Sequence, residues 1–267
     1  MNKEKRVWVI GAGWIGMPLV GRLIREGYRV GATSRQEDKL ARIAALGATA
    51  CLFDLEQDPP EGLFSGAGTV ILTIPPDRQE PGEETYARKM GRLARMLGEE
   101  PRAVFLSSTS VYGANQGEAD ESLTPYPDTI QGKTVLHAEQ ELRSVLGNRL
   151  TILRLAGLVG PSRHPGRWLA GKTGLPGGNT PVNLVHQDDV IGILLRVLEN
   201  DAWGDVFNVC ADEHPLKSAF YPAMAPAIGA VPPTFREEPL LPSAKVVVNQ
   251  KSKNILTYTY VARIFNP

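Results

Sequence analysis

Short apolar runs alternate with segments of helical periodicity along the first part of the chain. Residues 6–10 (RVWVI) form an apolar run that ends in glycines, and residues 17–26 then place apolar side chains at helical spacing. The same alternation continues, with expected strands at 28–32, 49–53, 69–73 and 103–106 and expected helices at 36–46 and 84–97. Strands that alternate with helices predict an α/β fold with a doubly wound, parallel sheet of the Rossmann type.

The second half of the chain is less regular. The pattern there predicts helices at 134–145 and 190–198 and strands at 149–154 and 205–209. Residues 161–181 are rich in Gly and Pro and predict a loop with no more than one or two helical turns. We therefore predict a dinucleotide-binding domain over 1–160, to which 181–210 return, and a small substrate-binding lobe made of 161–180 and 211–267.

Composition and charge exclude several classes of protein. Lys and Arg together number 29, as do Asp and Glu, so no net field draws the chain to nucleic acid or to an anionic membrane. The two cysteines are too few for a disulfide framework, which favours a cytoplasmic setting, and the four histidines lack the spacing of a metal site. No apolar run reaches the roughly 18 residues of a membrane span, and glycines interrupt the N-terminal run that resembles a signal peptide.

The strongest candidate site is the glycine-rich turn after the first expected strand. Gly11, Gly13 and Gly16 form the spacing G-x-G-x-x-G around Trp14 and Ile15. Between a strand and a helix, the first Gly permits a tight turn, the second lets the backbone approach a pyrophosphate, and the third allows close packing. The turn therefore predicts a dinucleotide site; a purely structural turn is the alternative.

The end of the second expected strand bears on the identity of the dinucleotide. An acidic residue there binds the ribose 2′-hydroxyl of NAD, whereas an arginine accommodates the 2′-phosphate of NADP. The chain has Thr33, Ser34 and Arg35 and no carboxylate, which favours NADP, with NAD as the alternative. Arg35 could instead be a solvated surface charge. Asp54, after the third strand, is a candidate acceptor for the adenine amino group or a helix cap.

Three further segments carry a resemblance to a known family. Residues 105–113 (FLSSTSVYG), 181–190 (PVNLVHQDDV) and 206–209 (VFNV), together with GAGWIG, resemble motifs of the extended short-chain dehydrogenases/reductases, in particular the sugar-nucleotide epimerase/dehydratase branch. The resemblance covers nearly the whole chain. It implies that the Rossmann half binds NAD(P) and that a small C-terminal lobe binds the substrate.

The proton relay of that family is not matched. The family uses a Tyr with a Lys four residues later, and Gln131 and Val135 stand at the corresponding positions here. None of the seven tyrosines is followed by Lys at that spacing. Ser108 matches the family's Ser/Thr that binds the reacting oxygen, although a strand-end serine also forms turns.

Three residues are candidates to replace the missing acid. Tyr112 matches a family tyrosine that serves packing, and Tyr126 lies between two prolines. Lys133 is two residues from the expected lysine position, about 200° around a helix, and is expected to point away from the site. The chain thus resembles the atypical short-chain dehydrogenases, which keep the cofactor site and vary or lose the relay.

Two other segments stand out. The fourth strand is followed by Thr73, Ile74, Pro75 and Pro76, where extended members of the family have small residues. Thr73 and Pro75 are candidate cofactor-binding positions, and the prolines should stiffen the loop and remove N–H donors. Residues 166–173 match the Walker A string, but the prolines around them exclude the strand and helix that this motif needs.

Two hypotheses for function remain open. The first is an NADP(H)-dependent oxidoreductase or epimerase that acts on a hydroxyl or carbonyl of a small polar substrate, a nucleotide sugar being one candidate, with Ser108 positioning the oxygen. The second is a non-catalytic sensor or regulatory protein that has kept the dinucleotide site. The sequence carries no signal for oligomeric state.

Overall fold

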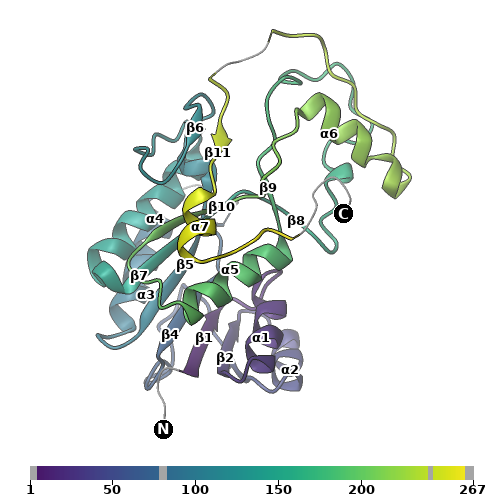
Figure 1. Ribbon diagram of the computed structural model, residues 1–267. Coiled ribbons are helices and arrows are strands. Elements are labelled where there is room, and N and C mark those ends of the chain that lie inside the picture. Colours follow the sequence, from purple (N-terminus) through teal and green to yellow (C-terminus); the bar gives the residue numbers. More distant parts are fainter. Residues whose placement is uncertain (1–4, 78–82, 240–242, 262–267) are drawn as a thin grey trace. The chain divides into compact units, whose positions relative to one another are not determined.

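The computed structural model describes residues 5–77, 83–239 and 243–261 (Figure 1). The chain groups into two compact units, each of which is described by itself. The first unit takes its residues from Met1–Ser108, Thr129–Arg154 and Val197–Val206. The second takes Thr109–Asp128, Leu155–Arg196 and Phe207–Pro267. The division into a dinucleotide domain and a substrate lobe, with the boundaries expected above, stays a prediction.

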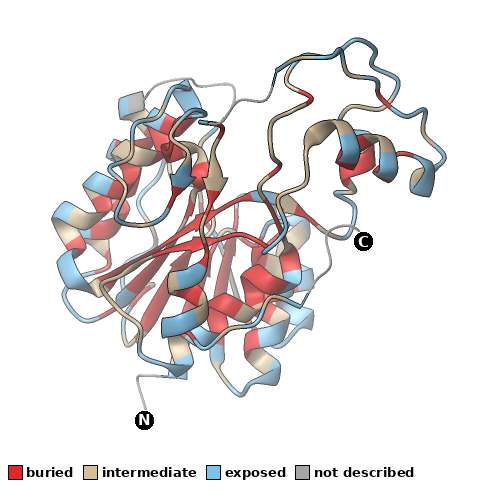
Figure 2. Ribbon diagram, turned by 45° about the horizontal axis from the view of Figure 1, so that its top comes forward, coloured by how far each residue is buried: buried red, intermediate tan, exposed pale blue. Residues whose placement is uncertain are grey.

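A seven-stranded parallel sheet confirms the expected α/β architecture. Its strands lie in the order β10-β7-β5-β4-β1-β2-β3. Their bounds are β1 Arg6–Ile10, β2 Arg29–Ser34, β3 Thr49–Leu52, β4 Thr69–Leu72, β5 Arg102–Ser108, β7 Leu150–Leu155 and β10 Val206–Val209. Apolar residues fill these strands, and Figure 2 shows the central ones as almost wholly buried. The strand order reverses between β1 and β4, which is where parallel α/β sheets bind their ligands.

Four helices connect the strands of the first unit. They are α1 (Gly16–Arg25), α2 (Asp38–Ala45), α3 (Glu83–Met96) and α4 (Ile130–Leu146). Right-handed crossovers place α1 and α2 on one face of the sheet and α3 and α4 on the other, because the strand order runs in opposite directions from β1 and from β4. Helices α3 and α4 pack against each other.

Helix α4 begins four residues earlier than the hydrophobic pattern predicted. Thr129 is extended and its Oγ1 accepts a hydrogen bond of 3.1 Å from the Gly132 amide, which is an N-cap. Gln131 and Lys133 therefore lie in the first turn of the helix. Periodicity alone did not show this start, because the first turn is mostly exposed.

The second unit is built from short elements. Strand β6 (Glu118–Ala119) pairs in parallel with β11 (Val246–Val247), and β8 (Gly157–Val159) pairs in parallel with β9 (Leu184–His186). Its helices include α5 (Gln187–Glu199), most of which lies in this unit, α6 (Lys217–Met224) and α7 (Gln250–Ile255). Short 3₁₀ helices cover Thr109–Val111, Pro165–Arg167 and Pro226–Ile228. The segment 161–181 thus contains one short helical turn, Pro165–Arg167, within the limit of one or two turns that its composition predicts.

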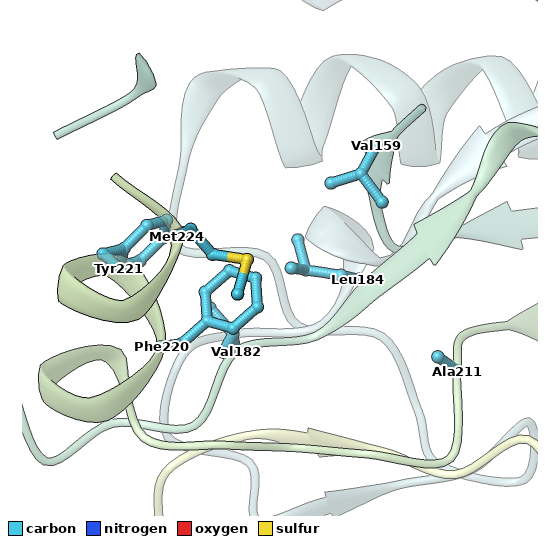
Figure 3. Packing of buried hydrophobic residues seen from close by; sticks show 7 residues of the cluster. All are labelled: Val159, Val182, Leu184, Ala211, Phe220, Tyr221 and Met224. Atoms are coloured by element: carbon cyan, nitrogen blue, oxygen red, sulfur yellow. The ribbon is translucent and has the colours of Figure 1, made fainter. Parts of the chain in front are cut away.

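A compact apolar cluster stabilises the second unit (Figure 3). Phe220, Tyr221 and Met224 come from α6 and lie against side chains from the β8–β9 region. The other members are Val159, Val182, Leu184 and Ala211, with Leu169 and Phe235 packed against them. Residues from 211 onward therefore share an apolar core with residues of the β8–β9 region, despite their many prolines.

The first unit contains a buried ion pair between α4 and β7. Glu139 and Arg154 are only 4% and 6% exposed, and the guanidinium binds the carboxylate through Nε–Oε1 (3.1 Å) and Nη2–Oε2 (2.7 Å). Ser107, near the end of β5, donates its hydroxyl to Oε1 of Glu139. One carboxylate therefore joins α4, β5 and β7.

We expect the neutral variant Glu139→Gln to lower the free energy of unfolding by about 3–5 kcal/mol, because it leaves the Arg154 charge buried without a counter-charge. Urea denaturation measures the change. The matched surface variant Arg22→Ala breaks an exposed pair with Glu26 (2.9 Å) and should change stability by less than about 1 kcal/mol. Equal effects of the two variants would contradict the assignment of Glu139 as a buried structural charge.

Candidate functional site

The loop Gly11–Gly16, called the glycine loop below, joins β1 to α1 at the point where the strand order reverses. Three backbone amides fix its course. The Gly11 amide donates to Thr33 Oγ1 (3.0 Å), the Ala12 amide donates to the Thr33 carbonyl (2.7 Å), and the Gly13 amide donates to the Gly11 carbonyl (2.7 Å). The loop is therefore anchored on the end of β2 and curls tightly on itself.

The three glycines of the loop differ in what surrounds them. Gly11 has φ of +103°, and a Cβ there would lie 2.8 Å from Ile74 Cγ1. A Cβ on Gly16 would overlap the Gly11 carbonyl oxygen. A Cβ on Gly13, by contrast, would meet no atom within 4 Å. The fold itself thus requires glycine at the first and third positions, whereas at the second position glycine leaves open space at the surface.

The beginning of α1 provides donors beside that space. No side chain caps the helix at Ile15, and its first turn contains no acidic residue. An uncapped helix N-terminus carries unpaired N–H groups and a partial positive charge, which together favour an anion such as a pyrophosphate. Trp14 is half-buried and Ile15 is buried. The residues present at the glycine loop therefore fit a dinucleotide.

The polar residues at the end of β2 have separate roles. Thr33 is buried and holds the Gly11 amide, and Ser34 Oγ accepts a hydrogen bond of 3.0 Å from the Gln36 amide. Arg35 is exposed, and within the part of the chain that the structure describes no side chain pairs with it. Both hydroxyls thus serve the backbone, and the guanidinium of Arg35 is the group available to an external anion.

Asp54 follows β3 and forms a local turn. Its Oδ1 accepts a hydrogen bond of 3.1 Å from the Glu56 amide, and the residue is partly buried. This turn uses one carboxylate oxygen. The contact with adenine stays a prediction.

The loop after β4 lies directly against the glycine loop. The Thr73 amide donates to the Ile10 carbonyl (3.0 Å), and Thr73 Oγ1 lies 3.0 Å from that carbonyl oxygen and 2.5 Å from the carbonyl oxygen of Gly11. Pro75 is exposed two residues further on. Thr73 therefore supports the structure of the glycine loop. Direct contact of Thr73 or Pro75 with a cofactor stays a prediction.

Ser108 ends β5 at the same edge of the sheet. The register pairs Ile10 with Leu72 and Leu72 with Phe105, so the carboxyl ends of β1, β4 and β5 are neighbours. Ser108 is partly exposed, whereas Ser107 beside it is buried and bound to Glu139. The structure thus brings Ser108 to the edge that also holds the glycine loop and Thr73.

The two candidate tyrosines have contrasting environments within the second unit. Tyr112 is 1% exposed, and its hydroxyl donates toward the Asp120 carbonyl (3.0 Å) and Asn208 Oδ1 (3.1 Å). Tyr126 is 78% exposed. The buried and hydrogen-bonded state of Tyr112 favours a packing role, and an acid role for either residue stays a prediction.

On α4, Gln131 and Val135 stand where the resemblance places the family's Tyr and Lys, and the two residues differ in solvent exposure. Gln131 is exposed in the first turn, and Val135 is 5% exposed. Lys133 is exposed. These environments fit Val135 as a core residue of the helix.

Lys245 is a residue that the sequence pattern did not single out. Its Nζ donates to the Thr109 carbonyl (2.9 Å) and to the Tyr112 carbonyl (3.0 Å), which belong to the turn directly after Ser108. Burial lowers the pKa of the Lys245 ammonium. More than 130 residues separate the lysine from this turn in the chain, so no local motif could have shown the contact.

The structure was also compared with the requirements of a phosphate-binding loop, a metal site and a membrane-spanning helix. The Walker-like segment has only the 3₁₀ helix Pro165–Arg167, and the Gly171 amide donates to the Val231 carbonyl (2.8 Å), so no strand and helix frame a phosphate loop there. Over residues 5–77, 83–239 and 243–261, no cluster of three or more His, Cys, Asp or Glu side chains could hold a metal ion. No helix in that part of the chain has the length and apolar character needed to cross a bilayer.

Comparisons with known proteins agree with this geometry. The model of the NAD dependent epimerase/dehydratase family matches residues 7–210. The chain is 37% identical to protein YeeZ of Escherichia coli strain K12 over 264 residues, which cover 96% of each protein. It is 30% identical over 265 residues to a 3-diazoavenalumate denitrifying reductase of a Streptomyces species, with 89% of this chain and 86% of that protein covered.

A solved structure shows the same fold. The crystal structure of UDP-glucuronic acid 4-epimerase from Bacillus cereus in complex with NAD superimposes with a TM-score of 0.81, covering 98% of this chain and 95% of that one at 19% identity. At this identity the likeness concerns the fold alone. The family match along most of the chain, together with the 37% identical relative, shows that the chain belongs to the NAD dependent epimerase/dehydratase family.

Proposed function

We propose that this protein is an NADP(H)-dependent oxidoreductase of the epimerase/dehydratase family that works without the usual Tyr–Lys pair. The observation that carries the proposal is the contrast among the loop glycines: Gly11 and Gly16 are closed in by protein, while Gly13 faces open space beside the uncapped start of α1. Such an opening has the form that a pyrophosphate requires. The glycine loop would hold the pyrophosphate, and Arg35 would hold the 2′-phosphate.

The chemistry follows from the groups at this edge of the sheet. When bound, the nicotinamide supplies or accepts a hydride. Ser108 would orient the reacting carbonyl or hydroxyl oxygen by a hydrogen bond from its hydroxyl. Gln131 has no useful pKa and Val135 has no polar atom, so neither residue can donate the proton that the family's tyrosine supplies. Tyr112 and Tyr126 stay candidates for that donor.

The substrate class is proposed as a small polar molecule with a carbonyl or hydroxyl group, with a nucleotide sugar as one candidate. Arg163 and Arg167 are exposed in the segment that the resemblance assigns to the substrate, and cations there suit a phosphate. The nearby Trp168 is 38% exposed and packs on Tyr221 with ring centroids 6.2 Å apart. The name of the Streptomyces relative, a reductase, also supports reductive chemistry on this fold.

The second candidate is a non-catalytic sensor of the dinucleotide. The observation that favours it is the pair of residues on α4, exposed Gln131 and buried Val135, where catalytic members have Tyr and Lys. A sensor would bind NADP(H) through the same glycine loop and would oxidise no substrate. Single-turnover oxidation of bound NADPH by a panel of carbonyl compounds and nucleotide sugars separates the two candidates.

Filling the open space at Gly13 should weaken the binding of both dinucleotides. We expect Gly13→Val to lower the affinity for NADPH and for NADH by at least about tenfold, because the new side chain would occupy the proposed pyrophosphate position, while its Cβ has no protein atom within 4 Å. Fluorescence titration measures both affinities. Gly21→Ala, whose Cβ would be in ordinary contact with Leu46 (3.7 Å), is the matched control and should bind normally. Normal binding by Gly13→Val would refute the proposed site.

Removing the guanidinium at the end of β2 should affect only one cofactor. We expect Arg35→Ala to weaken NADPH about tenfold and NADH little, because only NADPH carries the 2′-phosphate. Arg29→Ala, at the other end of the same strand, serves as the control for a general loss of positive charge. Equal losses for NADPH and NADH would rule out the phosphate role of Arg35.

Removing the hydroxyl of Ser108 should affect turnover but not cofactor binding. We expect Ser108→Ala to slow hydride transfer at least about tenfold, through loss of the hydrogen bond to the reacting oxygen, while NADPH affinity stays unchanged. Stopped-flow decay of NADPH absorbance measures the step. Unchanged hydride transfer would assign Ser108 to the structure of the turn.

A further inference from the structure

The loop after β4, residues Thr73–Pro76, is called the proline loop below. It bonds to the glycine loop through Thr73, whose Oγ1 lies 2.5 Å from the Gly11 carbonyl oxygen. Its next residue fills the space beside Gly11, where Ile74 Cγ1 lies 2.8 Å from the position that a Cβ on Gly11 would take. A shift of the proline loop would therefore change the space available to the glycine loop.

The two prolines restrict how the proline loop can move. A proline disfavours the helical conformation in the residue before it, so Pro75 favours an extended conformation at Ile74. Pro75 and Pro76 also lack an N–H group, so neither can donate a backbone hydrogen bond to stabilise another loop conformation. The Ile74 carbonyl accepts a hydrogen bond from a partner on another element.

That partner is Tyr86 on α3. Its hydroxyl donates a hydrogen bond of 2.6 Å to the Ile74 carbonyl, and the residue is 6% exposed. Burial raises the pKa of the Tyr86 phenol, which therefore stays protonated and able to donate. Loss of the donor to this part-buried carbonyl would destabilise the loop conformation that the hydrogen bond holds.

We propose that Tyr86 is a positioning residue for dinucleotide binding, which acts through Ile74 and Thr73 to hold the glycine loop in its binding conformation before the cofactor arrives. This inference rests on the proposed dinucleotide site. A loop that is ordered in advance binds more tightly, because binding then carries a smaller loss of conformational entropy. Tyr86 itself lies on α3, outside the G-x-G-x-x-G motif.

The first test is Tyr86→Phe, which keeps the ring and removes only the hydroxyl. We expect the affinities for NADPH and NADH to fall by the same factor, about threefold to tenfold, because both cofactors share the pyrophosphate. The equal loss distinguishes this variant from Arg35→Ala. The matched control Tyr258→Phe removes a hydrogen bond to Asp189 Oδ1 (2.8 Å) in the second unit and should leave both affinities unchanged.

The second test uses the cofactor-free protein and needs no binding. Amide hydrogen exchange of Gly11, Ala12 and Gly13 should be faster in Tyr86→Phe than in the wild type, because these amides form the bonds that fix the glycine loop. Thr73→Val should have a similar effect. The double variant should add little to either single change, because both residues act on the same loop.

The two tests distinguish the failure of this inference from the failure of the proposed function. Unchanged exchange in Tyr86→Phe, or unchanged affinity for a cofactor that the wild type binds, would overturn the positioning role. Faster exchange in a protein whose wild type binds neither dinucleotide would support the positioning of the loop and refute the proposed function.

Discussion

The close approach of the backbone at the glycine loop is the constraint on which the rest of the first unit depends. Gly16 must pass against the Gly11 carbonyl oxygen, and Gly11 must pass against Ile74, so neither position has room for a side chain. This contact sets where α1 begins relative to β1 and β4. Because the strand order reverses at the same place, the tightest backbone packing and the opening at Gly13 occur together.

Polar groups at the carboxyl ends of the strands reinforce this arrangement. Thr33 and Thr73 bind the backbone of the glycine loop from its two sides, and Tyr86 binds the backbone of the neighbouring loop. Ser107 fixes the end of β5 through Glu139. Most polar side chains near this edge thus serve the fold. Arg35, which is exposed and unpaired in the described part of the chain, and Ser108 are the groups that we propose act on a ligand.

Local patterns predicted the sheet well and the contacts of the site less well. Each of the strands β1, β4 and β5 contains a continuous apolar run, and the glycine spacing indicates the turn after β1, so these features can be inferred from neighbouring residues. The hydrophobic pattern predicts the start of α4 four residues too late, because Thr129 caps a mostly exposed first turn that has no apolar periodicity. The bonds of Thr33 to Gly11, of Tyr86 to Ile74 and of Lys245 to Thr109 depend on how distant segments pack, which no local motif records.

A fluorescence titration of the wild-type protein with NADPH and with NADH tests the proposed dinucleotide site most directly. We expect saturable binding of both cofactors at one site, with NADPH bound more tightly because only its 2′-phosphate can pair with Arg35. Failure of both cofactors to bind at millimolar concentration would contradict the assignment of the opening at Gly13 as a dinucleotide site.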